Sequence, residues 1–326
     1  MEDTFNLSLE KPQARPGHPW VALSELLGNE PSEPSVATLH EPSGQPLGSG
    51  LFDPAEPSRA WRRFSHAEGV NFDGAYIASA INDALGRRSD DHCQRLICGD
   101  ADYLPGLEVE LYDGIATIAS THALVDAAMD EIVACLREAC EPKEIVIYKN
   151  GAATTQSGQN LKARWVEVDG LAYRIDLLKT GQPRFFLDQR EQHALVGSLC
   201  EGRKVLDGYA HSGAFALQAA RAGAEHVVAV DTSEACIKAI GAAAQKNNCF
   251  VESIDGDVAA FLSERSAGDL DAIILDPPHS ESFDSAAVEA LHNCAFRCLP
   301  EGGLLATYCR SSSITAAAFE ATVARA

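Results

Sequence analysis

The sequence predicts an α/β protein whose last part is a doubly wound, Rossmann-like parallel sheet. Three observations predict it. From residue 204 onward, apolar β runs alternate with helical segments, which is typical of a parallel sheet. Residues 1–65 hold short apolar patches separated by Pro, Gly and Ser, which indicates a small β module. Residues 66–163 mix helical periodicity with hairpin-forming strands, which indicates a central α+β domain.

Composition narrows the class of protein. The chain has 326 residues, a hydrophobic fraction of 46% and a net charge of −21, enough length for two or three cores. The acidic balance argues against broad, non-specific nucleic-acid binding but leaves room for a local basic groove. Ten irregularly spaced cysteines predict free thiols in a reducing compartment, not a disulfide or zinc framework. With neither a signal peptide nor an apolar run of ~20 residues, we expect a cytoplasmic protein without a membrane partner.

The first two parts of the chain carry few chemical signals. In the β module, Arg59, Arg62 and Arg63 form a basic cluster, which indicates a solvated edge or, less directly, a nucleic-acid contact. In the central domain the periodicity predicts helices over residues 72–85 and 123–139 and strands over residues 94–98, 107–112, 115–120 and 144–148. Asp113-Gly114 predicts a hairpin turn between two of these strands.

Residues 164–326 form the predicted third domain. Two alternating runs flank Asp169-Gly170, so residues 164–178 are expected to form a hairpin. A segment dense in Gly, Pro, aromatic and charged residues follows, then a helix over residues 191–199. The predicted strands of the parallel sheet are 205–206, 227–230, 272–275 and 303–307, and its helices are 214–222, 233–247, 258–265 and 286–298. Ligands of such sheets bind at the carboxyl ends of the strands.

A loop of small residues follows the first strand of this sheet. Residues 204–231 read strand, glycine loop, helix, strand and acid, which is a βαβ unit built to hold a nucleotide-like ligand. Gly208 and Gly213 do not form the pattern of dinucleotide enzymes, which disfavours a dehydrogenase. Asp207 is expected at the entrance of the loop, where a carboxylate disfavours a diphosphate and suits the sulfonium and amino groups of S-adenosylmethionine. A tight turn without a ligand is the alternative.

Two more acids follow neighbouring strands, and each has two interpretations. Asp231 can accept hydrogen bonds from both ribose hydroxyls, or it can cap the next helix. Both interpretations hold together if Thr232 or Ser233 caps the helix while Asp231 binds the ribose. Asp257 can accept the adenine amino group, or it can cap the helix over residues 258–265.

Two strand exits carry the candidate catalytic groups. Strand 272–275 runs into Asp276-Pro277-Pro278-His279, where two prolines stiffen the exit and hold the carboxylate over the site. We therefore expect a catalytic role for Asp276 and not a plain strand-to-loop exit. Cys309 follows strand 303–307, and as a thiolate it can attack C6 of a pyrimidine and make C5 nucleophilic. Neighbouring Arg310 is expected to lower the pKa of this thiol. The alternative is an inert thiol.

Together these features resemble the three-domain class I S-adenosylmethionine-dependent methyltransferases of large-subunit ribosomal RNA, typified by the bacterial 23S rRNA cytosine-C5 enzymes. The resemblance covers nearly the whole chain. The motifs that carry it are residues 15–21, 48–54, 95–107, 179–181 with 185–190, 205–215 and 276–278.

The resemblance implies an RNA-binding PUA-like domain over residues 1–65, a central domain over 66–163 and a methyltransferase domain over 164–326. It implies a structured RNA as partner. By analogy, the residues expected to bind S-adenosylmethionine are Phe186, Asp188, Arg190, Asp207, Gly208, Tyr209, Ala210, His211, Ser212, Gly213, Phe215, Asp231, Thr232, Ser233, Asp257, Val258, Asp276 and Pro277.

Four departures from the family pattern bear on function. Gln182-Pro183-Arg184 is inserted in the linker motif, and His279 stands where the family has another basic or aromatic residue. The family continues past the equivalent of Ala326, so the last strands of the sheet are expected to be missing. In the cytosine-C5 members the last motif reads Thr-x-Ser-Cys-Ser. An ungapped alignment puts Arg310 at the cysteine and Cys309 one place earlier, and a one-residue shift on a strand reverses the face.

Two classes of function therefore stay open. The first is an enzyme that methylates a base of RNA, ribosomal by resemblance. If cytosine C5 is the acceptor, Cys309 attacks the ring and Asp276 stabilises it; if a guanine or adenine nitrogen is the acceptor, Asp276 orients the amine and Cys309 is a bystander. The second is a binding protein for RNA or S-adenosylmethionine without catalysis. No metal is expected, and a homodimer is left open.

Overall fold

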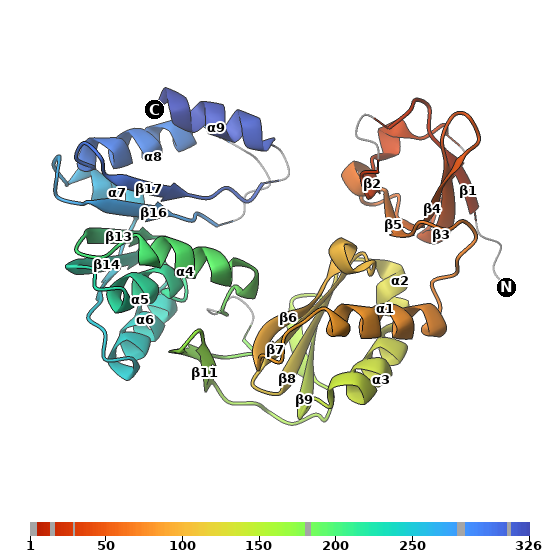
Figure 1. The fold of residues 1–326 in the computed structure, drawn as a ribbon, viewed down its shortest axis with the longest axis horizontal. Helices are drawn as coiled ribbons and strands as arrows, with labels where there is room; N and C mark the ends of the chain where they lie inside the picture. The colour runs from red at the N-terminus through yellow and green to blue at the C-terminus, as the bar shows by residue number, and fades with distance from the viewer. Residues whose placement is uncertain (1–4, 14–16, 29, 180–183, 279–283, 312–313) are drawn as a thin grey trace. The chain divides into compact units, whose positions relative to one another are not determined.

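The computed structural model describes residues 5–13, 17–28, 30–179, 184–278, 284–311 and 314–326 (Figure 1). The chain divides into two compact units, Met1–Leu161 and Lys162–Ala326. The first unit holds two five-stranded sheets, and the second holds a hairpin and a five-stranded parallel sheet. The further division of the first unit near residue 65 stays a prediction.

The first sheet is the predicted β module. Its strands are β1 (Phe5–Ser8), β2 (Trp20–Val21), β3 (Ser35–His40), β4 (Pro46–Phe52) and β5 (Trp61–Ser65), in the order β1-β3-β4-β5-β2, with short 3₁₀ turns at Leu23–Glu25 and Pro57–Arg59. Trp61 is fully buried and its indole N–H donates to the Ala37 carbonyl over 3.0 Å. A Cβ on Gly50 would lie 2.3 Å from that indole, so only glycine lets the ring pack there.

The predicted basic cluster of this module is not a solvated edge. Arg62 and Arg63 are both less than a tenth exposed. Arg62 pairs with Asp100, and Arg63 donates to the Gly17 carbonyl, while the Arg59 guanidinium lies over the Trp20 ring. Arg62 and Arg63 are therefore committed to internal contacts, because a buried charge needs a partner.

The second sheet has the order β10-β9-β8-β7-β6. Its strands are β6 (Cys93–Cys98), β7 (Leu107–Tyr112), β8 (Ile115–Ser120), β9 (Glu144–Lys149) and β10 (Ala152–Thr155), and helices α1 (Gly74–Gly86), α2 (Ala123–Ala127) and α3 (Met129–Cys140) accompany it, with a 3₁₀ turn, η3, at Gly99–Asp102. Figure 1 shows α1 and α3 side by side on one face of this sheet. The Asp113-Gly114 turn is confirmed, with both residues at positive φ.

Two features of this domain differ from the predictions. The single helix expected over residues 123–139 is wrong, because Ala128 leaves helical geometry at ψ 13° and separates α2 from α3. Strand β10 was not predicted, since its residues Ala-Ala-Thr-Thr show no alternation of apolar and polar side chains. It exists through antiparallel pairing with β9.

The second unit begins with the predicted hairpin. Strands β11 (Arg164–Val168) and β12 (Leu171–Ile175) pair around Asp169-Gly170, and both turn residues have positive φ. The side-chain amide of Asn247 pairs with both backbone groups of Ala172, each over 2.8 Å. Asn247 is the C-terminal cap of helix α6 (Glu234–Lys246), so this amide attaches the hairpin to the domain that follows it.

The parallel sheet has the order β15-β14-β13-β16-β17, which confirms the predicted doubly wound arrangement. Its strands are β13 (Lys204–Gly208), β14 (His226–Asp231), β15 (Glu252–Asp255), β16 (Ala272–Leu275) and β17 (Leu304–Thr307). The other helices are α4 (Arg190–Ser198), α5 (Ala214–Arg221), α7 (Val258–Ser263), α8 (Ser285–Cys298) and α9 (Ala316–Arg325), of which α9 was not predicted.

Alternate residues of the central strand face two separate cores. Val205 packs in a cluster with side chains of α4, α5 and α6, whereas Leu206 packs in a cluster with side chains of α7 and α8. Figure 1 shows the same two layers, with α8 on one side of the strands and α5 and α6 on the other. Because the order of strands reverses between β13 and β16, a crevice is expected at the carboxyl ends of those strands.

Candidate active site

The strand register brings the predicted site residues to one edge of the parallel sheet. Gly208, the last residue of β13, is opposite Val230 of β14 and Leu275 of β16. Leu275 in turn is opposite Thr307 of β17. The chain therefore leaves the sheet at the same edge after each of these positions. Asp231, Asp276 and the residues beyond Thr307 lie at these exits.

The glycine loop, residues 208–213, is held in a tight conformation. Tyr209, His211 and Gly213 all have positive φ, at 64°, 49° and 73°. Added Cβ atoms on Gly208 and Gly213 would lie 2.8 Å from side-chain carbons of Val258 and Ile240. The two glycines are therefore required where the loop packs against the neighbouring helices.

Asp207 lies in β13, directly before this loop. The residue is 1% exposed, and its Oδ2 accepts the Ala216 N–H in the first turn of α5 over 2.9 Å. Burial raises the pKa of this carboxyl well above its usual range. Its Oδ1 is buried and has no hydrogen-bond partner among the described residues. A contact of Asp207 with the cofactor stays a prediction.

Asp231 links the glycine loop to the next strand exit. Its Oδ2 accepts the His211 N–H over 2.9 Å, and its Oδ1 accepts the Ser233 N–H over 2.8 Å. Ser233, not Asp231, is the N-cap of α6. At the following exit, Asp257 caps α7 by accepting the Ala260 N–H over 2.8 Å. The capping interpretation of Asp257 is therefore correct, and ligand contacts of the two carboxylates stay predictions.

Asp276 forms a side-chain cluster that the sequence did not predict. Its Oδ2 accepts hydrogen bonds from Arg310 Nη2 over 2.8 Å and from Gln189 Nε2 over 3.1 Å. Gln189 Oε1 also accepts from Arg310 Nη2 over 2.6 Å. Burial raises the pKa of Asp276, while the Arg310 guanidinium opposes that shift. The other oxygen, Oδ1, is buried and without a partner among the described residues.

Arg310 also joins this cluster to the glycine loop. Its guanidinium carbon lies 4.2 Å from the centre of the Phe186 ring, and that ring stacks on His211 with centroids 4.6 Å apart. Burial lowers the pKa of His211 to about 4, so the imidazole is neutral at pH 7. Its Nδ1 is buried and has no partner among the described residues. Arg310, Phe186 and His211 thus form one stack across the edge of the sheet.

The environment of Cys309 does not favour a thiolate. The residue is half-buried, and burial raises the pKa of its thiol. The expectation that Arg310 lowers this pKa is wrong, because the guanidinium is paired with Asp276 instead.

The remaining predicted residues lie in four kinds of place. Phe215 and Val258 are core side chains, and Phe215 packs edge-on against His193. Arg190 pairs with Asp169 in the turn of the β11–β12 hairpin. At the surface or partly exposed are Asp188, Ser212, Thr232 and Pro277, and Ala210 is buried within the loop. Their roles stay predictions.

Some motif residues lie outside the described part of the chain. They are Arg15 and Pro16 of the first motif, Thr180, Gly181, Gln182 and Pro183 of the linker, and His279 after the two prolines. Within the described ranges, no group of three His, Cys, Asp or Glu side chains is placed to hold a metal ion. None of the helices described there is long and apolar enough to cross a membrane.

The residues of this edge fit a nucleoside that carries a cationic group. Three buried polar atoms, Asp207 Oδ1, His211 Nδ1 and Asp276 Oδ1, lack partners among the described residues, and a buried polar atom without a partner is destabilising. A ligand that brings hydrogen-bond donors or a positive charge satisfies such atoms. The sequence analysis included Gln189 only as part of the motif of residues 185–190 and gave it no role. It noticed Arg310 only because this residue aligns with the family's cysteine.

Comparisons with known proteins agree with this arrangement. A family model for a PUA-like domain matches residues 10–62, and one described as Conserved hypothetical protein 95 matches residues 190–321. A protein of Photobacterium profundum named ribosomal RNA large subunit methyltransferase I is 27% identical over 342 residues, which cover 95% of this chain and 85% of that protein. One of Deinococcus radiodurans, named ribosomal RNA large subunit methyltransferase, is 28% identical and covers 95% and 84%.

Solved structures share the fold. A Streptococcus mutans protein assigned as a SAM-dependent methyltransferase has a TM-score of 0.84 at 19% identity, with 98% of this chain and 89% of that chain covered. A structure assigned as a methyltransferase complexed with SAH has a TM-score of 0.82 at 19% identity, with the same coverage. The predicted fold class and the PUA-like module are therefore confirmed.

Proposed function

We propose that this chain is an S-adenosylmethionine-dependent methyltransferase that acts on large-subunit ribosomal RNA. The predicted enzyme class and cofactor are supported by relatives that are named for this activity and that align along 95% of the chain. The observation that carries the proposal is the edge where the glycine loop, Asp231 and Asp276 meet, at the switch point of the sheet. A ribosomal substrate also agrees with the predicted cytoplasmic location.

The cofactor half of the site is built from the glycine loop and Asp231. When bound, S-adenosylmethionine supplies an electrophilic methyl group. Asp231 is suited to accept the ribose hydroxyls, since each of its oxygens accepts one backbone N–H and retains a further lone pair. The unpaired polar atoms Asp207 Oδ1 and His211 Nδ1 belong to the residue that precedes this loop and to the loop itself. The protein's contribution here is to hold the methyl group in line with the acceptor.

The acceptor half is built from Asp276 and Arg310. We infer that transfer does not use Cys309 as a nucleophile, because burial raises the pKa of this thiol and Arg310 does not counter it. The unpaired Asp276 Oδ1 is suited to accept an N–H from the target base and to orient its nitrogen lone pair toward the methyl group. This supports a guanine or adenine nitrogen as acceptor over cytosine C5. The base would have to leave its stack to reach Asp276.

The test combines cofactor binding with identification of the product. Purified protein is titrated with S-adenosylmethionine by calorimetry and then incubated with unmodified large-subunit RNA and cofactor carrying a labelled methyl group. Digestion and mass spectrometry of the nucleosides identify the base. We expect binding and a label on a purine nitrogen. Labelled 5-methylcytidine would overturn the choice of acceptor, and an absence of heat with the cofactor would overturn the enzyme.

A binding protein without catalysis is the second candidate. The Arg310–Asp276 ion pair favours it, because the cation engages the carboxylate that a target base would need. This alternative predicts that the protein binds the cofactor but transfers no methyl group, either to naked RNA or to assembled ribosomal subunits.

A further inference from the structure

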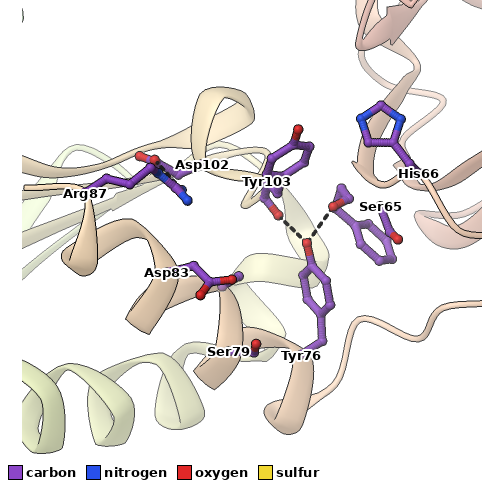
Figure 2. Close-up of a pocket in the computed structure, with 10 residues that line it drawn as sticks. Ser65, His66, Tyr76, Ser79, Asp83, Arg87, Asp102 and Tyr103 are labelled. Carbon is purple, nitrogen blue, oxygen red and sulfur yellow. Dashed lines mark hydrogen bonds and ion pairs between the residues drawn. The ribbon is translucent and has the colours of Figure 1, made fainter.

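A cavity of about 260 Å³ lies in the first unit. Its walls come from the end of β5, from helix α1 and from the η3 turn (Figure 2). The volume is at the lower end of the range for small-molecule sites, so it has room for one aromatic ring system and not for a chain of them. Nothing in the methyltransferase site uses this cavity.

One wall of the cavity is aromatic and held in an unfavourable conformation. Tyr103 has φ 59°, in the left-handed region, which is unfavourable for a bulky side chain. Its ring is 41% exposed and lies edge-on to His66, with centroids 5.9 Å apart. The Tyr76 hydroxyl lies 2.9 Å from the Tyr103 carbonyl and 2.6 Å from the Phe64 carbonyl, which holds this wall against β5. A large ring is thus kept at the surface of the cavity.

The opposite wall carries polar groups on one face of α1 and its cap. Ser79, Asp83 and Arg87 are spaced four residues apart, so they lie in one row along the helix. Asp83 is exposed, and its carboxylate has no hydrogen-bond or ion-pair partner among the described residues. Arg87 uses Nη2 to pair with Asp102 over 3.0 Å, and 48% of its side chain is exposed. The row therefore places an unpaired acceptor, the Asp83 carboxylate, next to a donor, the Arg87 guanidinium.

The floor of the cavity is rigid. Asp102 is 3% exposed and pairs with both Arg87 and Arg88, and it also accepts the Cys98 N–H over 2.7 Å. Asp100 of the same turn is paired with the buried Arg62 of β5 over 2.5 Å. These contacts join the η3 turn to the strand and helix that form the other walls, so the cavity does not depend on a mobile segment.

The pattern of groups selects among chemical classes of ligand. A free carboxylate in the cavity disfavours a phosphate. An exposed aromatic ring favours a planar base, since a base stacks on an aromatic side chain. Guanine presents two N–H donors on its Watson–Crick edge, which match the two oxygens of Asp83, and acceptors on its other edge, which match Arg87. Adenine has an acceptor at N1, which a carboxylate repels.

We propose that this cavity binds an unpaired guanine of the RNA substrate, stacked on Tyr103 and read by Asp83 and Arg87. The proposal rests on the proposed function, because it takes the partner to be RNA. It assigns the first unit a role in recognising the RNA substrate. The acidic chain gains affinity for one exposed base by stacking and hydrogen bonds, without the phosphate contacts that a basic surface would supply.

The test uses the full chain and short single-stranded RNA. Hexanucleotides of uridine that carry one central guanosine, adenosine or cytidine are titrated by fluorescence anisotropy. We expect the guanosine probe to bind at least about tenfold more tightly than the other two. Asp83→Asn should remove this preference and improve binding of the adenosine probe, because an amide pairs with adenine. The matched control Asp90→Asn changes an exposed acid outside the cavity and should behave as wild type.

Three results separate this proposal from the proposed function. Equal binding of the three probes by the wild-type protein, or an unchanged preference in Asp83→Asn, overturns the guanine site. Tyr103→Ala should weaken all three probes, and if that variant loses thermal stability, Asp83→Asn still decides. Calorimetry with S-adenosylmethionine is run on the same samples, so a failure of the methyltransferase appears as lost cofactor binding while the guanine preference remains.

Discussion

The two halves of the strand-end edge are held by different kinds of bond. In the cofactor half, the carboxylates accept backbone N–H groups: Asp207 from Ala216, and Asp231 from His211 and Ser233. In the acceptor half, Asp276 is held by side chains, those of Arg310 and Gln189. Backbone donors are set by the loop and helix that carry them. Side-chain donors depend on which residue stands at each position, so the acceptor half is the more easily altered.

The largest expected effect comes from removing the charge of the acceptor half. Asp276→Asn should lower kcat by about 10²-fold or more, the range for loss of a positioned base, while the Kd of S-adenosylmethionine stays within about threefold. Initial rates and calorimetry measure the two quantities. Glu201→Gln, a change of an exposed acid in the turn before β13, is the matched control and should leave both unchanged. Equal losses in the two variants would contradict the assignment.

A defect in the cofactor half should show in binding instead. Gly213→Val places a branched side chain at φ 73° and against Ile240, so we expect cofactor affinity to fall at least about tenfold, with a lower Tm. Gly241→Ala in α6 has open space around the new methyl group and should raise stability by about 0.5–1 kcal/mol. Calorimetry and thermal melts of the two variants test this. Normal affinity in Gly213→Val would mean that the loop does not hold the cofactor.

The ion pair of the acceptor half predicts a pH effect of intermediate size. Arg310 opposes the rise of the Asp276 pKa that burial causes. In Arg310→Gln the pKa of Asp276 should therefore rise further, and the acid limb of the kcat/KM profile should move to higher pH, with a loss of about tenfold at neutral pH. Arg310→Lys keeps the charge and should move the limb less. A shift to lower pH, or none, would show that the ionised Asp276 is not required.

The smallest effect is expected at Cys309. If the thiol is a bystander, Cys309→Ser should change kcat by no more than about threefold, since it removes neither charge nor an ion pair. A loss of about 10³-fold, accompanied by a covalent RNA–protein adduct in the wild type, would restore the nucleophile and contradict the nitrogen acceptor. Gel shifts under denaturing conditions detect such an adduct.

The sequence predicted what depends on neighbours along the chain. The Asp113-Gly114 and Asp169-Gly170 turns and the glycine loop are confirmed in position, because positive φ and close packing restrict those places to a few residue types. The break at Ala128 and strand β10 were missed, since packing and pairing decide them. The burial of Asp207 was missed for a similar reason. The N–H of Ala216 comes within hydrogen-bonding distance of its carboxylate only once α5 has formed.

The Asp276 cluster could not be predicted for another reason. Its members are residues 189, 276 and 310, which only the completed sheet brings together. No local pattern marks Gln189 as a donor. Arg310 attracted notice because it replaces a family cysteine, but the sequence does not show which side chain it faces. Pairs of side chains that are distant in the sequence form only when the fold brings them together. Here the proposed acceptor, a purine nitrogen, depends on such a pair, Arg310 and Asp276.

The Asn247 amide has a consequence for how the protein opens. Asn247 bonds to both backbone groups of Ala172 and so acts as an extra strand partner contributed by the end of α6. The Ala172 N–H is thereby protected by a bond that breaks only when the hairpin leaves that helix. Its exchange with solvent deuterium then reports the opening of the hairpin and the methyltransferase domain as one cooperative segment, although the hairpin lies at the boundary between the two units of the chain.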